Sequence, residues 1–202
     1  MPAHTAKSLF DQNIKSAEDC LALYDAIEEL KPRDLEIKWM LRASVVFIVS
    51  ALDSYFHDKI RYSVGRIRLP QAPQALLKFE ITVSDLQTWS KAHRKGNVLR
   101  NLVTKHFATR PLQSRTAIAD ALKLIGIDSF WDKIEPDKPK KERLLKNLDT
   151  LVNRRNKITH EGDRLTSRRS GKKLRGISRK GVVASISFAK DLVNKVEQVF
   201  QN

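Results

Sequence analysis

The feature that most constrains the fold is a long run without glycine or proline, which extends from Asp34 to Val64. Within this run, residues 43–52 are apolar almost all round, with Arg42 and Asp53 at the two ends. A helix that is apolar on every side is normally buried. Ten residues are too few to cross the hydrocarbon core of a bilayer, which needs about 20. The run therefore predicts a long, buried central helix and no membrane segment.

The remaining segments predict shorter helices around this central one. Between Ala6 and Leu30, apolar residues recur at spacings of three and four, the period of an amphipathic helix: Phe10, Ile14, Ala17, Leu21, Tyr24 and Ile27. Further helices are expected over residues 84–93, 97–107, 114–125 and 181–200, and over a long segment that begins near Pro139. We predict an all-α bundle of one domain, residues 1–202, in which residues 66–137 are inserted short helices.

Three details of this assignment are specific enough to test. Ser84 and Gln87 have the spacing of a capping box at the start of a helix. Residues 75–83 are short and apolar, and their pattern fits a helix or a strand equally well. Residues 130–139 are expected to form a polar turn anchored by Trp131.

The charge balance indicates the kind of partner. Lysine and arginine number 38 against 23 aspartate and glutamate, which gives a net charge of +15. Such a basic chain favours a polyanion, with nucleic acid first and an anionic membrane surface second. The lone Cys20 excludes an internal disulfide and suits a reducing compartment. Because the N-terminus also lacks an apolar signal core, we expect a cytoplasmic location.

A second basic feature is concentrated in one segment. Of the seventeen residues from Arg164 to Lys180, eight are basic: Arg164, Arg168, Arg169, Lys172, Lys173, Arg175, Arg179 and Lys180. We expect a mobile loop or a β-hairpin over residues 163–180 that neutralises phosphates without regard to sequence. The alternative is a solubilising segment with no role in binding.

One arginine lies where a core residue is expected. Leu144, Leu148, Leu151 and Ile158 follow each other at steps of four, three and seven, and the position that these steps skip is Arg155. Because arginine is seldom buried without a partner or a ligand, Arg155 needs an acidic side chain or an anion. His160 follows, and Gly162 is a typical helix stop.

These residues carry a resemblance to a known family. The sequence Arg155-Asn156-x-x-x-His160 resembles the Arg-polar-x-x-x-His signature of the HEPN superfamily, whose members are all-α and in many cases ribonucleases. The long second helix with Ala51-Leu52-Asp53-Ser54-Tyr55-Phe56, together with the late motif helix, is similar to the RiboL-PSP-type branch. A second pair, Arg100 and His106, has five intervening residues instead of four, and we interpret it as the polar face of a surface helix.

The resemblance implies a reaction that uses no metal and no cofactor. In HEPN ribonucleases the 2′-hydroxyl attacks the adjacent phosphate and leaves a 2′,3′-cyclic phosphate. By resemblance, Arg155, Asn156 and His160 would be catalytic. Histidine exchanges protons near neutral pH, and the guanidinium stays charged as negative charge develops on phosphate. We found no convincing metal-ligand cluster and no phosphate-binding glycine loop in the sequence.

The spacing within the motif raises the question of how one site is formed. Five residues at about 100° each place Arg155 and His160 roughly 140° apart around a straight helix. Either the helix bends or ends near Thr159, or a second copy of the motif completes the site. The family resemblance implies the second solution, a homodimer with two motifs across a cleft. One histidine would then act as the base and the other as the acid.

Other residues are assigned supporting roles. Asp53 is our candidate carboxylate partner for Arg155, although it could instead face solvent or pair with Lys59 or Arg61. His57 could line the cleft, and Glu161 could fix the tautomer of the histidine. Arg154 and Lys157 join the eight basic residues of the loop as candidate RNA contacts.

The sequence and its resemblance to HEPN proteins therefore predict a metal-independent endoribonuclease that acts on RNA, as a toxin or defence effector. An antitoxin or another subunit of an effector complex would fit such a function. The alternative is a non-catalytic HEPN module that binds RNA or a partner protein and uses the Arg-His pair structurally. A DNA-binding regulator would need a helix-turn-helix with a clear recognition helix, and the sequence shows none.

Overall fold

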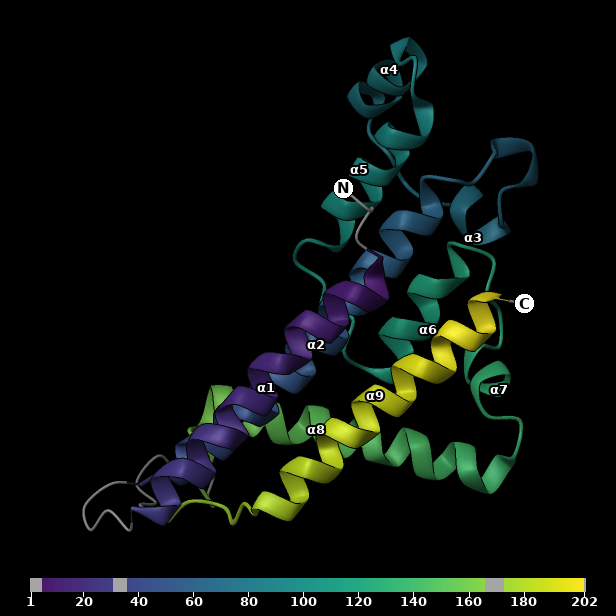
Figure 1. The fold of residues 1–202 in the computed structure, drawn as a ribbon. Coiled ribbons are helices and arrows are strands. Elements are labelled where there is room, and N and C mark those ends of the chain that lie inside the picture. Colours follow the sequence, from purple (N-terminus) through teal and green to yellow (C-terminus); the bar gives the residue numbers. More distant parts are fainter. Residues whose placement is uncertain (1–4, 31–35, 166–172, 202) are drawn as a thin grey trace. The chain divides into compact units, whose positions relative to one another are not determined.

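The computed structural model describes residues 5–30, 36–165 and 173–201, and every element in them is helical. The helices, shown in Figure 1, are α1 Ala6–Glu29, α2 Lys38–Val64, η1 Leu69–Gln71, α3 Gln74–Leu77, α4 Val83–Lys91, α5 Lys95–Phe107, α6 Arg115–Lys123, α7 Phe130–Ile134, α8 Lys138–Glu161 and α9 Arg179–Gln201. In these residues the only strand-like contact is a single antiparallel bridge between Arg164 and Leu174. The predicted all-α class is confirmed.

The chain divides into two compact units. The first comprises residues 1–52 and 142–202, and the second comprises residues 53–141. Helix α2 supplies its first half to one unit and its second half to the other, and α8 is shared in the same way near its start. The second unit starts earlier and ends later than the insertion expected over residues 66–137. That both units belong to one domain stays a prediction.

The first unit is built from α1, the first half of α2, most of α8, and α9. Its core includes Phe10, Ile14 and Ala17 from α1, Leu41, Val45, Ile48 and Val49 from α2, Leu148 and Leu151 from α8, and Val182, Leu192, Val193 and Val196 from α9. The Ser44 hydroxyl donates 2.8 Å to the carbonyl of Ala17, which joins α2 to α1. Arg179 pairs with Asp25 at 2.7 Å, which joins α9 to α1. The motif helix α8 is therefore held in a packed bundle.

The second unit contains the short helices. The indole of Trp131 donates 2.9 Å to the carbonyl of Arg115, which ties α7 to the start of α6. Gly96 lies so close to the carbonyl oxygen of Gly65 that an added Cβ would be 2.4 Å from it, so only glycine fits there. Gly126, at φ 83°, follows α6 as the stop that the sequence predicted.

Several local predictions were wrong. Residues 130–134 are helix α7 and not a polar turn, because Phe130 and Ile134 are four residues apart and bury on one side. The capping box at α4 uses Thr82 and Asp85, which have the same spacing two residues earlier than the expected Ser84 and Gln87. The ambiguous segment begins with the short helix α3 and continues without regular structure to Thr82.

Among the described residues, helix α2 is the one helix that is long and apolar enough to cross a membrane. Its most apolar stretch has a mean hydropathy of 1.3, and 56% of that stretch is buried. The core helix of a soluble protein can have the same length and composition. The buried interpretation of α2 thus agrees with its packing, while the cytoplasmic location stays a prediction.

Candidate functional site

The site is organised by the way in which α8 ends. The backbone N–H of Asp163 donates 2.8 Å to the carbonyl of Lys157, six residues earlier. Gly162 has φ 61° and Asp163 has φ 57°, both in the left-handed region. This bond spans one residue more than the bond of a Schellman motif, and a glycine in the left-handed region directly after the last helical residue is a common way to end a helix. The end of the helix that carries the motif is therefore fixed by its own backbone.

The motif residues lie in the last turns of α8. Arg155 is half-buried, and its Nη1 donates 3.1 Å to the side-chain oxygen of Asn156. The Nε of Arg155 is buried and has no hydrogen-bond partner among the described residues. His160 is exposed to solvent. The structure thus brings Arg155 and Asn156 into contact and leaves the imidazole accessible.

The direction of these side chains follows from the length of α8. The helix continues through Glu161, so both Arg155 and His160 belong to it. On a regular helix their side chains leave the axis about 140° apart. The guanidinium of Arg155 and the imidazole of His160 on one α8 helix are therefore directed to different sides, and not to one phosphate.

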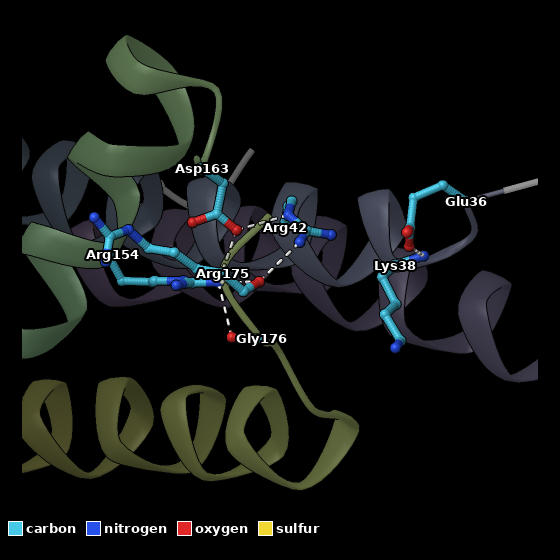
Figure 2. A network of polar contacts seen from close by, with 7 residues as sticks. All are labelled: Glu36, Lys38, Arg42, Arg154, Asp163, Arg175 and Gly176. Atoms are coloured by element: carbon cyan, nitrogen blue, oxygen red, sulfur yellow. Dashed lines mark hydrogen bonds and ion pairs between the residues drawn. The ribbon is translucent and has the colours of Figure 1, made fainter. Parts of the chain in front are cut away.

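Beside the motif lies a buried ionic network, which we name the latch: Arg42, Arg154, Asp163 and the backbone of Arg175 (Figure 2). The Asp163 side chain is 0% exposed and accepts 2.7 Å from Nε of Arg42 and 2.7 Å from Nη2 of Arg154. Nη2 of Arg42 also donates 3.0 Å to the carbonyl of Arg175. The latch connects α2, the end of α8 and the loop before α9. Side chains of α2 and α8 therefore stabilise the backbone that ends the motif helix.

The latch was not predicted from the sequence. Arg42 was considered only as the flank of an apolar stretch, and Asp163 was given no partner. Arg42 interrupts a helix face that is otherwise buried, between Leu41 and Val45, and its side chain is only 2% exposed. Like Arg155, Arg42 is an arginine at a position where a core residue is expected, and it therefore needs a partner.

The basic segment is partly described. Arg168, Arg169 and Lys172 lie outside the described residues. Leu165 N–H donates 3.0 Å to the carbonyl of Lys173, beside the bridge between Arg164 and Leu174, so residues 164–165 and 173–174 lie side by side in antiparallel directions. Arg179 and Lys180 lie in the first turn of α9, so the expected loop boundary at residue 180 was too late.

The basic side chains differ in what they already contact. Lys173, Arg179 and Lys180 are exposed, whereas Arg164, Arg175 and Lys157 are half-buried. Arg179 is paired with Asp25. Arg154 donates through Nη2 to Asp163 and to the carbonyl of Gly176 at 3.0 Å, so part of its guanidinium is used inside the protein. Contact of these residues with RNA stays a prediction.

The supporting residues are distributed over both units. Asp53 lies in the second unit, where its carboxylate accepts 2.6 Å from the backbone N–H of Leu112 and lies 3.6 Å from Nε2 of His57. Asp53 therefore contacts protein groups and does not simply face solvent, and neither of these two contacts is with Arg61. The pairing of Asp53 with Arg155 stays a prediction. Glu161 is exposed at the end of α8. The roles of Glu161 and His57 in the site stay predictions.

The pair Arg100 and His106 is not a simple solvated face. His106 is half-buried, packs edge-on against Phe79 with ring centroids 4.8 Å apart, and lies 2.6 Å from Nη1 of Arg110. Burial, followed by the charge of Arg110, lowers the pKa of His106 from its ordinary value. Arg100 is half-buried against Gly65. Both side chains therefore contribute to packing in the second unit.

No group of three or more His, Cys, Asp and Glu residues in the described part of the chain is arranged to hold a metal ion. The metal-independent reaction stays a prediction.

Comparison with protein families decides the assignment. The family model described as RiboL-PSP-HEPN matches residues 11–202, which includes both units and the whole motif helix. The chain belongs to the RiboL-PSP-HEPN family. This membership confirms the resemblance found in the sequence and agrees with the all-helical fold of this HEPN protein. It also supports a nuclease-type or RNA-related function. Searches of curated proteins and of solved structures gave no match.

Proposed function

We propose that this RiboL-PSP-HEPN protein is a metal-independent endoribonuclease with Arg155 and His160 in its active site. The observation that carries the proposal is the state of Arg155: a half-buried guanidinium whose buried Nε lacks a hydrogen-bond partner among the described residues. A buried donor without a partner costs free energy, about 1–3 kcal/mol, unless a ligand satisfies it. The half-buried guanidinium donates one hydrogen bond within the described residues, from Nη1 to Asn156, so it keeps N–H donors for an RNA phosphate. The exposed His160 lies on the same helix.

The proposed reaction divides proton transfer between two histidines. One imidazole takes the proton of the 2′-hydroxyl, and the 2′ oxygen attacks the adjacent phosphorus. The bond to the 5′ oxygen breaks, and a second imidazole gives that oxygen a proton. Arg155 stabilises the charge that develops on the phosphate oxygens, and Asn156 orients Arg155 through the hydrogen bond to its Nη1. The products are a 2′,3′-cyclic phosphate and a 5′-hydroxyl.

The position of His160 supports its role. It lies in the last turn of α8, on the same helix as Arg155, and its imidazole is exposed. An RNA substrate can therefore reach the group that would exchange protons with it.

The directions of Arg155 and His160 support a homodimer. Since they leave one helix about 140° apart, a second copy of the motif offers the simplest way to complete a site. The basic side chains after the motif would bring RNA to this interface through its phosphates. A cytoplasmic toxin or defence effector, held in check by an antitoxin or another partner, is the setting that such an activity fits.

The experiment that tests this function is RNA cleavage in EDTA. We expect the wild-type protein to cleave single-stranded RNA and leave 2′,3′-cyclic phosphate ends, and the variants His160→Ala and Arg155→Ala to lose at least about 100-fold in rate. His93→Ala serves as the control, because His93 is an exposed histidine outside the motif. Cleavage that needs magnesium, or that persists in both motif variants, would refute the mechanism. RNA binding without cleavage would instead favour the non-catalytic HEPN module.

A further inference from the structure

Helix α4 carries an apolar side that the fold leaves uncovered. Val83, Leu86 and Trp89 follow each other at steps of three along this helix, which places them on one side of it. None of the nine residues of α4 is buried, and Val83 and Leu86 are exposed. An amphipathic helix at a protein surface normally turns its apolar side towards the core. The uncovered side of α4 is therefore a candidate interaction surface.

Next to this side lies an apolar hollow with a volume of about 200 Å³. Its walls come from the loop after α3 and from three helices of the second unit (Figure 1): Leu76 and Leu77 of α3, Leu86 and Trp89 of α4, and Leu99 and Leu102 of α5. Small ligands usually occupy pockets of at least about 300 Å³. The hollow is smaller than that, and Leu77 and Ile81 in its walls are exposed. It therefore fits side chains that project from a larger partner.

A polar hollow adjoins the apolar one. It has a volume of about 490 Å³ and shares three residues with it: Phe79, Ile81 and Leu102. Lys105 and Arg110 also line the polar hollow, and both are exposed. Of its two acids, Asp85 already accepts hydrogen bonds from the backbone N–H and the hydroxyl of Thr82, which leaves Glu80 as the other carboxylate. Positive charge therefore predominates beside the apolar hollow.

The segment that forms both hollows is basic as a whole. Residues 74–110 contain seven lysines and arginines against two acids, which gives a net charge of +5. Lys95, in the first turn of α5, has its Nζ 4.6 Å from the centre of the Trp89 ring, and Lys105 lies in the last turn. Along α5, cations thus precede Leu99 and follow Leu102. A complementary partner is apolar where it meets the hollow and acidic on both sides of that contact.

These charges decide among the possible occupants. A second copy of the chain would bring the same basic segment to this surface, and like charges across an interface repel. The internal stretches outside the described residues, 31–35 and 166–172, have five and seven residues, fewer than the roughly 11 residues of three helical turns. An anionic membrane would attract the same cations, but a bilayer surface has no side chains to fill a hollow. A separate acidic protein segment meets both requirements.

We propose that the surface formed by α3, α4 and α5 binds an amphipathic helix of a partner protein. Apolar side chains of that helix, at steps of three and four, enter the apolar hollow, as in helix-in-groove recognition. Its acidic side chains lie beside Lys95, Lys105 and Arg110. Helix α5 has 13 residues and is about 20 Å long, which offers contact to roughly three and a half turns of a bound helix.

This surface belongs entirely to the second unit, whereas Arg155 and His160 belong to the first. The inference therefore goes beyond the proposed RNA cleavage and does not depend on it.

The test uses a fluorescein-labelled helical peptide of about 18 residues, or five turns, and fluorescence anisotropy with the full chain. The peptide carries leucines at steps of three and four, with glutamate and alanine elsewhere. We expect saturable binding of one peptide per chain. A peptide with lysine in place of glutamate, and one with the same composition in scrambled order, should each bind at least about tenfold more weakly. Binding that does not saturate, or equal binding of the three peptides, would overturn the proposal.

A matched pair of leucine variants locates the binding on this surface. Leu86 lines the apolar hollow, whereas Leu23 of α1 does not, and the two are 50% and 53% exposed. Leu86→Gln should weaken binding of the glutamate peptide at least about tenfold, and Leu23→Gln should leave it unchanged. Because both side chains are exposed, neither variant removes a core residue. Equal affinities of the two variants for the peptide would contradict the assignment.

Reversal of charge tests the role of the cations. The double variant Lys105→Glu, Arg110→Glu should bind the glutamate peptide at least about tenfold more weakly than the wild type and should bind the lysine peptide more tightly than the wild type does. Loss of stability alone would weaken both peptides. An unchanged preference for the glutamate peptide would mean that these two cations do not face the partner.

Two other results would assign the surface to a different occupant. If the peptide does not bind, but the wild type sediments with phosphatidylserine–phosphatidylcholine vesicles and Leu86→Gln does not, the surface contacts a membrane. If sedimentation velocity shows a dimer that Leu86→Gln dissociates, a second copy covers the surface. Either result would refute the proposal. RNA cleavage is not measured in these experiments, so failure of this proposal and failure of the ribonuclease proposal are distinguishable.

Discussion

The Nε of Arg42 lies 2.7 Å from the carboxylate of Asp163, although the two residues are 121 positions apart and their side chains are 2% and 0% exposed. This pair joins the first half of α2 to Asp163, the second residue after the end of α8. Because a buried charge without its partner is costly, the pair fixes where the chain goes after the motif. It therefore connects the longest apolar helix of the protein with the position of His160.

The first prediction concerns the stability of this pair. Asp163→Asn keeps the shape of the side chain and tolerates the left-handed backbone, but it leaves the buried Arg42 without a counter-charge. We expect the free energy of unfolding to fall by about 3–5 kcal/mol. Urea unfolding followed by circular dichroism measures this loss.

A surface pair in the same unit provides the control for Asp163. Asp25→Asn breaks the exposed ion pair with Arg179, which is screened by solvent, so a much smaller loss is expected. Double-mutant cycles with Arg42→Met should show strong coupling to Asp163→Asn. Losses of equal size in the two aspartate variants would contradict the structural role assigned to the latch.

The second prediction concerns the helix stop. Gly162→Ala places a side chain at φ 61°, so we expect a loss of about 1–2 kcal/mol in the free energy of unfolding. Gly176→Ala is the matched control in the same loop, because a Cβ there would meet no atom within 4 Å. Thermal unfolding of both variants checks the difference. Equal melting temperatures would show that the left-handed stop contributes nothing to stability.

The sequence predicted those elements whose signals are local. The apolar spacing between Ala6 and Leu30 matches the observed helix Ala6–Glu29, and the run without glycine or proline ended at Val64 as expected. The helix of residues 130–134 was missed because five residues are too few for a periodic pattern. The capping box was shifted by two residues because Thr82 and Ser84 both begin a sequence with the required spacing.

The site was predictable in its motif but not in its support. Arg155 and His160 stand out because of residue type and spacing on one helix. The partners of Asp163 were not predictable, because Arg42 lies on another helix and long-range ion pairs leave no periodic signal in a sequence. Likewise, nothing near Asp53 in the chain indicates that it would bind the backbone of Leu112, 59 positions away.

The third prediction tests the composite site. If each active site needs motifs from two chains, inactive His160→Ala protein should poison the wild type after subunit exchange. With equal amounts of the two proteins, about half of the wild-type chains pair with the variant, so the cleavage rate per wild-type chain should fall to about one half. An RNA cleavage assay at constant wild-type concentration measures this. An unchanged rate after complete exchange would mean that one chain acts alone.

The fourth prediction concerns the basic segment. Neutralising Arg168, Arg169, Lys172 and Lys173 should weaken RNA binding and reduce the slope of log affinity against log salt, by about 0.7 for each RNA phosphate that the segment no longer neutralises. The control neutralises the same number of exposed cations near the start of α8: Lys138, Lys140, Arg143 and Lys146. Filter binding at several salt concentrations gives both slopes. If the two sets change the slope equally, binding depends on net charge and not on this segment.

The fifth prediction concerns pH. His106 has a lowered pKa because it is partly buried and lies beside Arg110, so the folded protein takes up this proton less readily than the unfolded chain, whose histidine has a pKa of about 6.5. The unfolded state then binds more protons, and the stability from His106 is complete above about pH 6.5 and declines as the pH falls towards its folded pKa. Urea unfolding at pH 7.5 and 5.5 should show a smaller acid-induced decrease for His106→Gln than for the wild type, whereas the exposed control His93→Gln should behave as the wild type does. An NMR titration of the His106 ring that reaches its midpoint at or above 6.5 would disprove the assignment.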